Sequence, residues 1–343
     1  MSRPRILFLA NAGPQVGGGH VMRSLTLART FHDRGADICF LASPEVQRVL
    51  DVFGPDMKTT SVASPEPAPI IAAAGGLAFD AVVFDHYDLG RAEHQAVASG
   101  RPALVIDDLA DRLLGGDLVL DPGPARKARD YDGLLGKAQL LLGPAYAPVR
   151  PAFVALRETA LRRRRDPVRR ILVALGLTDV GGITARVVQR LQRIDSDLVF
   201  SVVVGGEAAS LSQLRDLAAQ DHRIELHIDS HDMAKLTAAA DIAVGAGGST
   251  TWERCALGLP SVLVVLADNQ RPAAEALGAK GAALVLDVAD AELEQCLGAS
   301  VHRLMSDDAL RRRVSEASAA LCDGRGARRV TDAFLAFIAG SHP

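Results

Sequence analysis

Short apolar runs alternate with amphipathic segments through the first half of the chain. Runs such as RILFLA at residues 5–10 and DICFLA at 37–42 are rich in side chains that favour β-strands. Between them, residues 20–35 repeat apolar side chains at helical spacing and end on Gly35, a common helix stop. Short strands separated by helices predict a parallel sheet that is covered on both faces.

The same pattern restarts in the second half of the chain. RILVALG at 170–176 parallels RILFLAN at 5–11 and is followed by a glycine-containing loop and an amphipathic segment at 183–194. The alternation breaks between the halves, at a proline-rich segment (143–151) and a charged one (161–170). The sequence therefore predicts an α/β protein with two Rossmann-like domains, parallel sheets and an inter-domain cleft.

These breaks also set the expected domain boundaries. We expect the first domain at residues 1–150, a linker at 151–168 and the second domain at 169–343. The last two predicted helices, within 309–322 and 328–340, are assigned to the second domain. Their pattern equally allows them to cross back to the first.

The charge balance narrows the range of partners. Of 343 residues, 38 are Lys or Arg and 41 are Asp or Glu, which gives a formal net charge of -3. No long tract of one sign indicates an electrostatic hold on nucleic acid or on an anionic membrane. The arginine run at 162–165 lacks interleaved aromatic residues, so a solvated face is favoured over a nucleic-acid patch. A small-molecule partner is expected instead.

The cysteines and the N-terminal segment indicate the compartment. The 4 cysteines are far apart and form no CxxC pair, which argues against a zinc site or a disulfide framework. The apolar run ILFLA is too short for a signal sequence or a spanning helix. We expect a cytoplasmic protein with reduced thiols, no cofactor and no bound metal.

Three glycines stand directly before a histidine at the start of the first predicted helix. Gly17, Gly18 and Gly19 lack the spacing of a dinucleotide fingerprint, so they are expected to bring the backbone close to a different ligand. His20 would lie at a helix N-terminus, which disfavours the imidazolium and leaves a ring that can accept a proton. A capping or packing role is the alternative.

Polar residues also follow two later strands. FDHYDL at 84–89 places Asp, His and Tyr side chains where open α/β sheets bind ligands, but an Asp-rich turn is equally ordinary after a strand. The pair Asp107 and Asp108 has no further ligand at metal-binding spacing, so a structural role is favoured.

A third motif, GAGGSTTWER at 245–254, is the most specific. Glycines turn the chain after a strand, and the following hydroxyl residues begin a helix, an arrangement that suits a diphosphate. Glu253 could accept both hydroxyls of a ribose, or it could complete a capping box with Thr250. Trp252 is expected in the core.

Five segments together carry a resemblance to a known family: GGGHVMRSLTLA, VVFDHYDL, VIDDLADR, LLGPAYAPVRPAF and GAGGSTTWERCALGLPSVLVVLADNQ. In this order, between about Arg5 and about Asp287, they resemble the UDP-2,4-diacetamido-2,4,6-trideoxy-β-L-altropyranose hydrolases of pseudaminic acid biosynthesis. That family has the GT-B architecture. The resemblance implies hydrolysis of a UDP-sugar at its anomeric carbon, with inversion and release of UDP.

The resemblance also implies roles for individual residues. His20 matches the general base that deprotonates water, Glu253 matches the ribose-binding glutamate, and the backbone near Ile228 matches the uracil site. The complete expected substrate-binding set is Gly17, Gly18, Gly19, Tyr87, Thr178, Ile228, Gly248, Ser249, Thr250, Glu253 and Asn269. Because UDP is a good leaving group, dipoles at the phosphates would suffice without a metal.

The chain departs from the family at Leu9 and Asn11, where an Arg and an Asp are usual, and at residues 176–179, where a second glycine is common. Two other functions therefore stay open. One is a GT-B glycosyltransferase that passes the sugar to an acceptor, and the other is a UDP-sugar-binding protein without catalysis. Whether the product serves flagellin glycosylation or a surface polysaccharide is also open.

Overall fold

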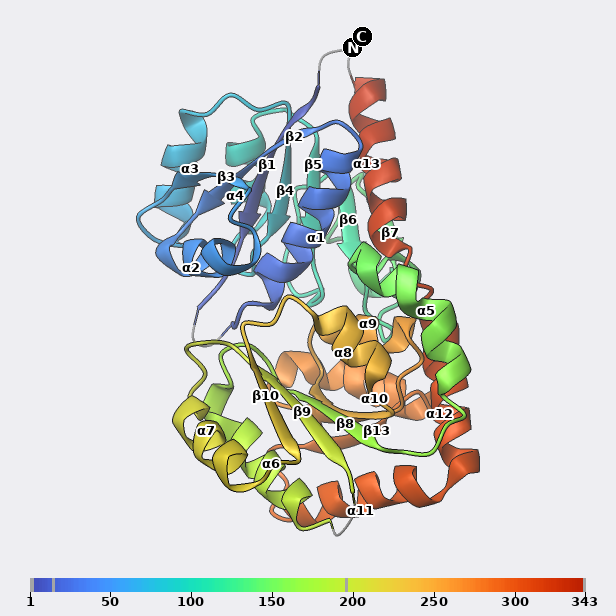
Figure 1. Ribbon diagram of the computed structural model, residues 1–343. Helices are drawn as coiled ribbons and strands as arrows, with labels where there is room; N and C mark the ends of the chain where they lie inside the picture. The colour runs from blue at the N-terminus through green and yellow to red at the C-terminus, as the bar shows by residue number, and fades with distance from the viewer. Residues whose placement is uncertain (1–2, 14–15, 195–196, 342–343) are drawn as a thin grey trace. The chain divides into compact units, whose positions relative to one another are not determined.

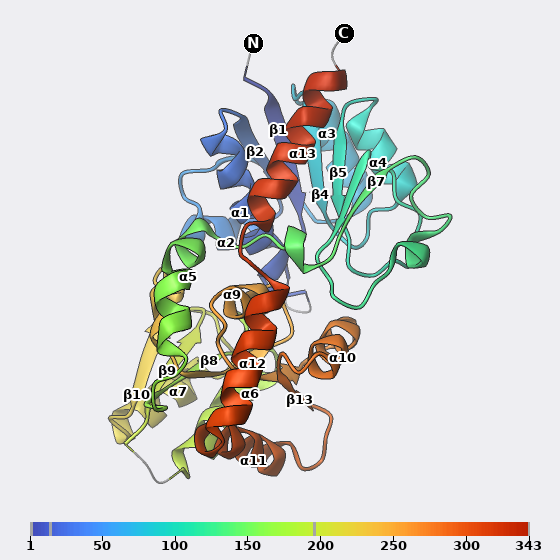
Figure 2. The same cartoon turned by 90° about the vertical axis from the view of Figure 1, so that its right-hand side faces the viewer.

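The computed structural model describes residues 3–13, 16–194 and 197–341, which form two compact units. The first unit contains the chain up to Pro148 together with the segment from Arg325 onward, and the second runs from Val149 to Gly324. Figures 1 and 2 show that each unit is a sheet flanked by helices. The predicted α/β class with two parallel Rossmann-like sheets is confirmed.

The first unit is built on a 7-stranded parallel sheet in the order β3-β2-β1-β4-β5-β6-β7. Its strands are β1 (Arg5–Ala10), β2 (Asp37–Ala42), β3 (Lys58–Ser61), β4 (Ala81–Asp85), β5 (Ala103–Ile106), β6 (Leu118–Asp121) and β7 (Gln139–Leu142). Its helices are α1 (Gly19–Asp33), α2 (Pro44–Phe53), α3 (Pro67–Gly75), α4 (Arg91–Ala98) and α13 (Gly326–Ser341), with short 3-10 turns at η1 (Ala128–Tyr131) and η2 (Pro144–Tyr146). The central strands are buried along almost their whole length because helices cover both faces.

The second unit has a 6-stranded parallel sheet in the order β10-β9-β8-β11-β12-β13. Its strands are β8 (Arg170–Ala174), β9 (Val199–Val204), β10 (Ile224–Ile228), β11 (Ile242–Ala246), β12 (Ser261–Val265) and β13 (Leu284–Asp287). Its helices are α5 (Pro151–Arg163), α6 (Ile183–Gln192), α7 (Leu211–Gln220), α8 (Met233–Ala239), α9 (Thr250–Ala256), α10 (Arg271–Ala279), α11 (Leu293–Ser306) and α12 (Asp308–Leu321), with 3-10 turns at η3 (Val180–Gly182) and η4 (Asp268–Gln270).

Strand order defines one switch point in each sheet. In the first sheet β1 lies between β2 and β4, so the loops that follow β1 and β4 leave the sheet in opposite directions. In the second sheet β8 and β11 have the same relation. Open α/β sheets bind ligands beyond the carboxyl ends of such strands. We therefore expect the candidate residues at these two edges.

The last helix lies in the first unit, whereas the predicted boundaries placed it in the second domain. α13 packs against α1 in the first unit, where the rings of Phe31 and Phe334 have centroids 5.9 Å apart and Arg34 forms a 2.8 Å ion pair with Asp332. Figures 1 and 2 both show the two helices side by side. The apolar stripe of α13 fits either domain, so periodicity alone could not assign it.

The expected linker also differs, because most of it is helical. Pro151 begins α5, and its buried Phe153 and Ala160 lie on the helix side that packs against α8 and α9 of the second unit. Proline and the arginine run suggested a connection, but Pro at the first helical position favours a helix start.

None of the helices described is long and apolar enough to cross a membrane. Within residues 3–13, 16–194 and 197–341, no group of three or more His, Cys, Asp or Glu could hold a metal ion.

Candidate functional site

His20 lies at the switch point of the first sheet, in the first turn of α1. Its Nδ1 is 2.5 Å from Oδ1 of Asp85, the last residue of β4. The two side chains are buried, with His20 6% and Asp85 0% exposed. Parallel pairing aligns Ala10 with Asp85 and so brings the end of β4 beside the turn that leads into α1. The contact therefore follows from sheet topology.

Arg23 holds Asp85 from the same helix. Its Nε and Nη2 donate to the two carboxylate oxygens of Asp85 at 2.7 and 2.6 Å, and its Nη1 donates to Asp108 at 2.8 Å. Burial alone would raise the pKa of Asp85, but the charges of Arg23 and His20 and their hydrogen bonds hold that pKa well below its usual range. The same balance lowers the pKa of Asp108. Asp85 is therefore ionised at neutral pH.

Sequence reasoning did not single out Arg23. The signal was its position three residues after His20, which places both side chains on one face of the helix. A charged residue on the buried side of a helix needs a partner of opposite charge, and Asp85 supplies it.

The contact with Asp85 assigns the ring proton of His20. An ionised carboxylate only accepts hydrogen bonds, so Nδ1 carries a proton toward Asp85, and Nη2 of Arg23 lies 3.0 Å from the same nitrogen. In a neutral ring this tautomer leaves the lone pair on Nε2. The capping alternative is wrong, because the N-cap of α1 is Gly18 and the His20 side chain binds Asp85. A packing role accounts for the burial of the ring but not for its hydrogen bond with Asp85.

The residues in the turn after β4 have two kinds of contact: one of them contacts His20, and the others bond the local backbone. The ring of Tyr87 meets His20 edge to face, with centroids 4.5 Å apart, and a hydrogen bond from its hydroxyl helps to lower the pKa of Asp108. His86 is buried, and its Nδ1 accepts from the N–H of Asp88 at 3.2 Å, so these two residues shape the turn. Tyr87 thus lies beside His20.

The pair Asp107 and Asp108 serves two different networks. Asp108 binds Arg23, whereas Asp107 accepts hydrogen bonds from Arg112 Nη1 at 2.7 Å and from the Tyr131 hydroxyl at 3.0 Å. Asp107 therefore has a structural role in its own unit.

The three glycines before His20 lie at the start of α1: Gly18 is its N-cap and Gly19 its first residue, and Gly17 precedes them. Gly17 has a φ of +73° and donates its N–H to the carbonyl of Gly13 at 2.7 Å. A positive φ favours glycine, so the need for Gly17 is conformational. Two of the positions that depart from the pattern of the resembled family lie in this unit: Leu9 is buried in its core, and Asn11 is buried with its Nδ2 3.5 Å from Asp88.

The glycine-rich turn of the second unit, residues 247–250, follows β11. Gly247 donates its N–H to Oε1 of Gln270 at 3.2 Å, and the same oxygen accepts from Leu266 at 3.1 Å. Gln270, which sequence reasoning missed, therefore ties the turns after β11 and β12 together. A Cβ on Gly248 would meet nothing within 4 Å, and the N–H groups of residues 248–250 have no acceptor among the described residues. These groups are available to an anion.

Glu253 forms an ion pair instead of a capping box. Its two carboxylate oxygens accept from Nε and Nη2 of Arg150 at 2.6 and 3.0 Å, and the residue is 7% exposed. Ser249, the N-cap of α9, makes no side-chain cap, so the capping-box alternative is wrong. Each carboxylate oxygen accepts up to two hydrogen bonds, which leaves capacity for ribose hydroxyls.

The other predicted ligands of the second unit lie at the carboxyl edge of the same sheet. Thr178 follows β8, Ile228 ends β10 with 36% of its surface exposed, and the exposed Asn269 lies in η4 after β12. Next to Thr178, the buried Asp179 accepts hydrogen bonds from Thr184, at 2.8 Å from its N–H, and from the N-terminus of α7. Because the strands of this sheet are parallel, the carboxyl edge holds Thr178, Ile228, Asn269 and residues 248–250.

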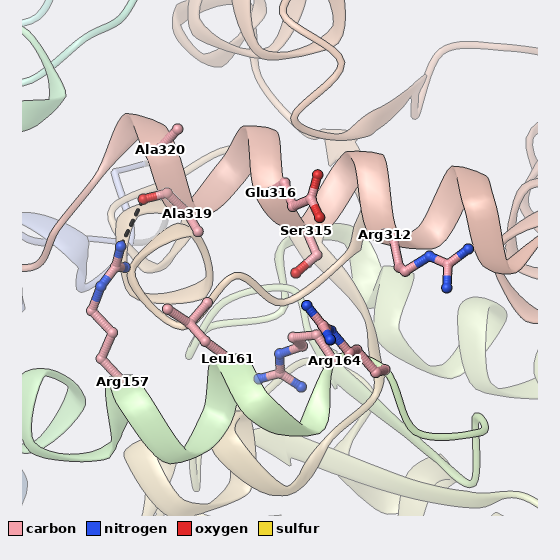
Figure 3. A pocket seen from close by; sticks show the side chains of 9 residues that line it. Arg157, Leu161, Arg164, Arg312, Ser315, Glu316, Ala319 and Ala320 are labelled. Atoms are coloured by element: carbon pink, nitrogen blue, oxygen red, sulfur yellow. Dashed lines mark hydrogen bonds between the residues drawn. The ribbon is translucent and has the colours of Figure 1, made fainter.

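A pocket of about 360 Å³ between α5 and α12 of the second unit contains none of the predicted site residues (Figure 3). Two arginines of its lining are committed to backbone carbonyls: Arg157 donates to Ala319 at 2.8 Å, and Arg164 to Leu257 at 3.0 Å. Arg164 is buried, so the prediction that residues 162–165 form a solvated face is wrong at this position.

Comparison with solved structures defines the structural class. MurG of Acinetobacter baumannii superimposes with a TM-score of 0.68, covering 97% of this chain and 99% of that chain at 17% identity. Residues 185–326 match the Glycosyltransferase family 28 C-terminal domain. The chain is therefore a GT-B-fold protein whose C-terminal part resembles that of family 28 glycosyltransferases.

Three curated relatives are similar to larger or smaller parts of the chain. It is 28% identical to the spore coat polysaccharide biosynthesis protein SpsG of Bacillus subtilis over 57% of this chain and 58% of that protein. It is 23% identical to the UDP-2,4-diacetamido-2,4,6-trideoxy-beta-L-altropyranose hydrolase of Campylobacter jejuni over 81% of this chain and 97% of that protein. It is also 28% identical to the UDP-N-acetylglucosamine--N-acetylmuramyl-(pentapeptide) pyrophosphoryl-undecaprenol N-acetylglucosamine transferase of Xylella fastidiosa, over 93% of this chain and 94% of that protein.

Proposed function

We propose that this protein is an enzyme that hydrolyses a UDP-sugar at the anomeric carbon and releases UDP and a free 2,4-diacetamido-2,4,6-trideoxy sugar. The buried network of His20, Asp85 and Arg23 carries the proposal. It holds a neutral imidazole through Nδ1, and Nε2 makes no hydrogen bond to any described residue. This is the arrangement of a general base.

The proposed step is a single displacement. The oxygen of a water molecule forms a bond to C1 while the bond from C1 to the diphosphate oxygen breaks, so its electron pair leaves with UDP and C1 is inverted. Nε2 of His20 takes the proton of the water. Asp85 stabilises the imidazolium that forms, and Arg23 keeps Asp85 ionised so that it remains a hydrogen-bond acceptor.

The second unit supplies the groups proposed to bind UDP. The free N–H groups at residues 248–250 and the hydroxyls of Ser249 and Thr250 would receive the diphosphate. Glu253, held in place by Arg150, would accept the ribose hydroxyls. Backbone near Ile228 would hold uracil. The leaving group then needs little protonation, because these dipoles stabilise the charge that develops on it.

The particular substrate is inferred from the likeness to the Campylobacter jejuni hydrolase. On this basis the protein acts in pseudaminic acid biosynthesis in the cytoplasm, with a UDP-sugar as its partner and with no cofactor, nucleic acid or membrane. Tyr87 beside His20 and Asn269 at the edge of the second sheet would contact the sugar.

A GT-B glycosyltransferase is the second candidate, and two observations favour it. Residues 185–326 match a glycosyltransferase domain, and the likeness to the Xylella fastidiosa transferase covers nearly the whole chain. In that reaction His20 would deprotonate an acceptor hydroxyl instead of water.

Incubation of the purified protein with a panel of UDP-2,4-diacetamido sugars, without any acceptor, separates these functions. We expect UDP release from at least one of them. Release that begins only after an acceptor is added supports the transferase. UDP binding with no turnover under either condition supports a protein that binds UDP-sugars without catalysis.

A further inference from the structure

We propose that Arg254 is the buried countercharge for the phosphate groups bound at the glycine-rich turn, residues 247–250, and that it acts on them through the hydroxyl of Thr250. This inference rests on the proposed function, because the anion in question is the diphosphate of a UDP-sugar. It assigns a positioning role to a residue that never needs to reach the ligand itself.

The guanidinium of Arg254 lies directly behind the turn. Its Nη2 donates to the carbonyl of Ala246 at 2.7 Å and to Oγ1 of Thr251 at 3.1 Å, and its Nη1 donates to Oγ1 of Thr250 at 3.1 Å. A Cβ on Gly245 would overlap this guanidinium, so the backbone passes it with only a hydrogen in between. The side chain is thus fixed against the backbone that forms the turn.

The charge of Arg254 has no carboxylate partner. The residue is 3% exposed, its Nε makes no hydrogen bond, and no ion pair between described residues includes it. Its acidic neighbour Glu253 is already bound by two nitrogens of Arg150. Burial lowers the pKa of Arg254 to about 10, so the side chain is still protonated at neutral pH. A buried cation without a counterion is unfavourable, and an anion at the turn would relieve it.

Thr250 connects this cation to the open side of the turn. Its Oγ1 accepts from Arg254, so its own hydroxyl hydrogen must point to another acceptor. Thr250 is half-buried, and its hydroxyl makes no donor hydrogen bond to a described residue. By contrast, the hydroxyl of Thr251 donates inward to Ala246 at 3.2 Å. A phosphate oxygen would accept from Thr250, and the adjacent cation would strengthen that bond.

Arg164 provides a matched control in the same unit. It too is buried, and burial lowers its pKa to about 10 as well. Its nitrogens donate to the carbonyls of Leu257, Ala240 and Thr237 and to no hydroxyl group. Loss of Arg164 should therefore affect stability without affecting recognition of phosphate.

The test measures binding of UDP and of uridine by calorimetry to the full-length wild-type protein and to R254M, R254K and R164M. We expect R254M to weaken UDP binding about tenfold or more and to leave uridine binding unchanged, because only UDP carries phosphate. R254K, which keeps the charge, should recover part of the loss. R164M should bind the two ligands in the wild-type ratio.

T250V decides the question if R254M does not fold. It keeps the shape of the side chain and removes the hydroxyl, and we expect a severalfold loss of UDP affinity with no change for uridine. Wild-type UDP affinity in T250V and in any folded R254M would overturn the role of Arg254 and leave the proposed function intact, as would equal losses for UDP and uridine. A wild-type protein that binds no UDP would overturn both.

Discussion

Two buried arginines, one in each unit, differ in whether a carboxylate compensates their charge. Arg23 in the first unit lies between Asp85 and Asp108, so carboxylates compensate its positive charge beside His20. Arg254 in the second unit has only backbone and hydroxyl oxygens as acceptors. A closed network keeps a base in one orientation, whereas an uncompensated cation is prepared to receive an anion. Under the proposed function, the closed network serves the chemistry in the first unit and the uncompensated cation serves phosphate recognition in the second.

The largest effect is expected for His20→Ala. Loss of a general base lowers turnover by about a hundredfold to ten-thousandfold, and UDP affinity should stay at the wild-type value because the groups proposed to bind UDP lie in the second unit. Steady-state UDP release and calorimetry measure the two quantities. His32→Ala, an exposed histidine on the same helix, is the control. A similar loss of UDP affinity in His20→Ala would contradict the division between the units.

Asp85→Asn should give the next largest effect. The amide no longer enforces the productive ring orientation or stabilises the imidazolium, so we expect kcat to fall about a hundredfold with little change in KM. Asp88→Asn, at an exposed position three residues later, should keep wild-type kcat. Equal kcat values for Asp85→Asn and the wild type would remove Asp85 from the mechanism.

The same substitution has a pH signature in stability. The pKa of Asp85 is depressed in the folded state, so its contribution is fully present above the unfolded pKa of about 3.9 and is lost as pH falls through the folded value. The difference in unfolding free energy between wild type and Asp85→Asn should therefore be present at about pH 5 and shrink as the pH falls below about 4. Denaturant titrations at several pH values measure it. A difference that does not shrink below about pH 4 would contradict the role of the Asp85 carboxylate.

Glu253→Gln tests whether Glu253 binds the ribose. If Glu253 binds the ribose, the wild type should prefer UDP over 2′,3′-dideoxy-UDP, and the variant should lose about tenfold of that preference. Glu275→Gln, on the exposed side of α10, is the control. A variant that weakens both nucleotides equally would mean that Glu253 serves only to hold Arg150.

The smallest effect concerns Asp121, a carboxylate of the first unit that forms no ion pair with any described residue. The Tyr131 hydroxyl lies 3.0 Å from both Asp107 and Asp121, but its one proton serves only one of them. Burial raises the pKa of Asp121 to about 6, so wild-type stability should fall as pH rises through that value. Asp121→Asn should be about 1–2 kcal/mol more stable at pH 7.5 and equal to the wild type below about pH 4. A pH-independent difference between the two proteins would contradict this assignment.

The fold was predictable from the sequence because strands and helices differ in period, and the restart at residues 170–176 marked the second sheet. The unit to which α13 belongs was not predictable, because its apolar stripe could pack against either sheet. The helix α5 was not predicted because the arginine run indicated a solvated segment. That prediction is right at Arg162, which is exposed, and wrong at Arg164, which is buried.

The candidate site was predictable in part. His20 begins the helix that follows β1 and Tyr87 lies just after β4, positions that suggest a ligand, and the structure brings their rings together. Their contacts with Asp85 and Asp108 were not predictable, because such contacts join residues far apart in the chain. Arg150 and Glu253, for example, are separated by 103 positions, and no local pattern indicates that they meet.

The position of an oxygen label tests the central claim most directly. The UDP-2,4-diacetamido sugar that is turned over is hydrolysed in water enriched in oxygen-18, without an acceptor, and both products are analysed by mass spectrometry. The account predicts one labelled oxygen in the sugar and none in UDP, because water attacks C1. Label in UDP would place the attack at phosphorus, where neither His20 nor Asp85 has been assigned a role, and would contradict the proposed mechanism.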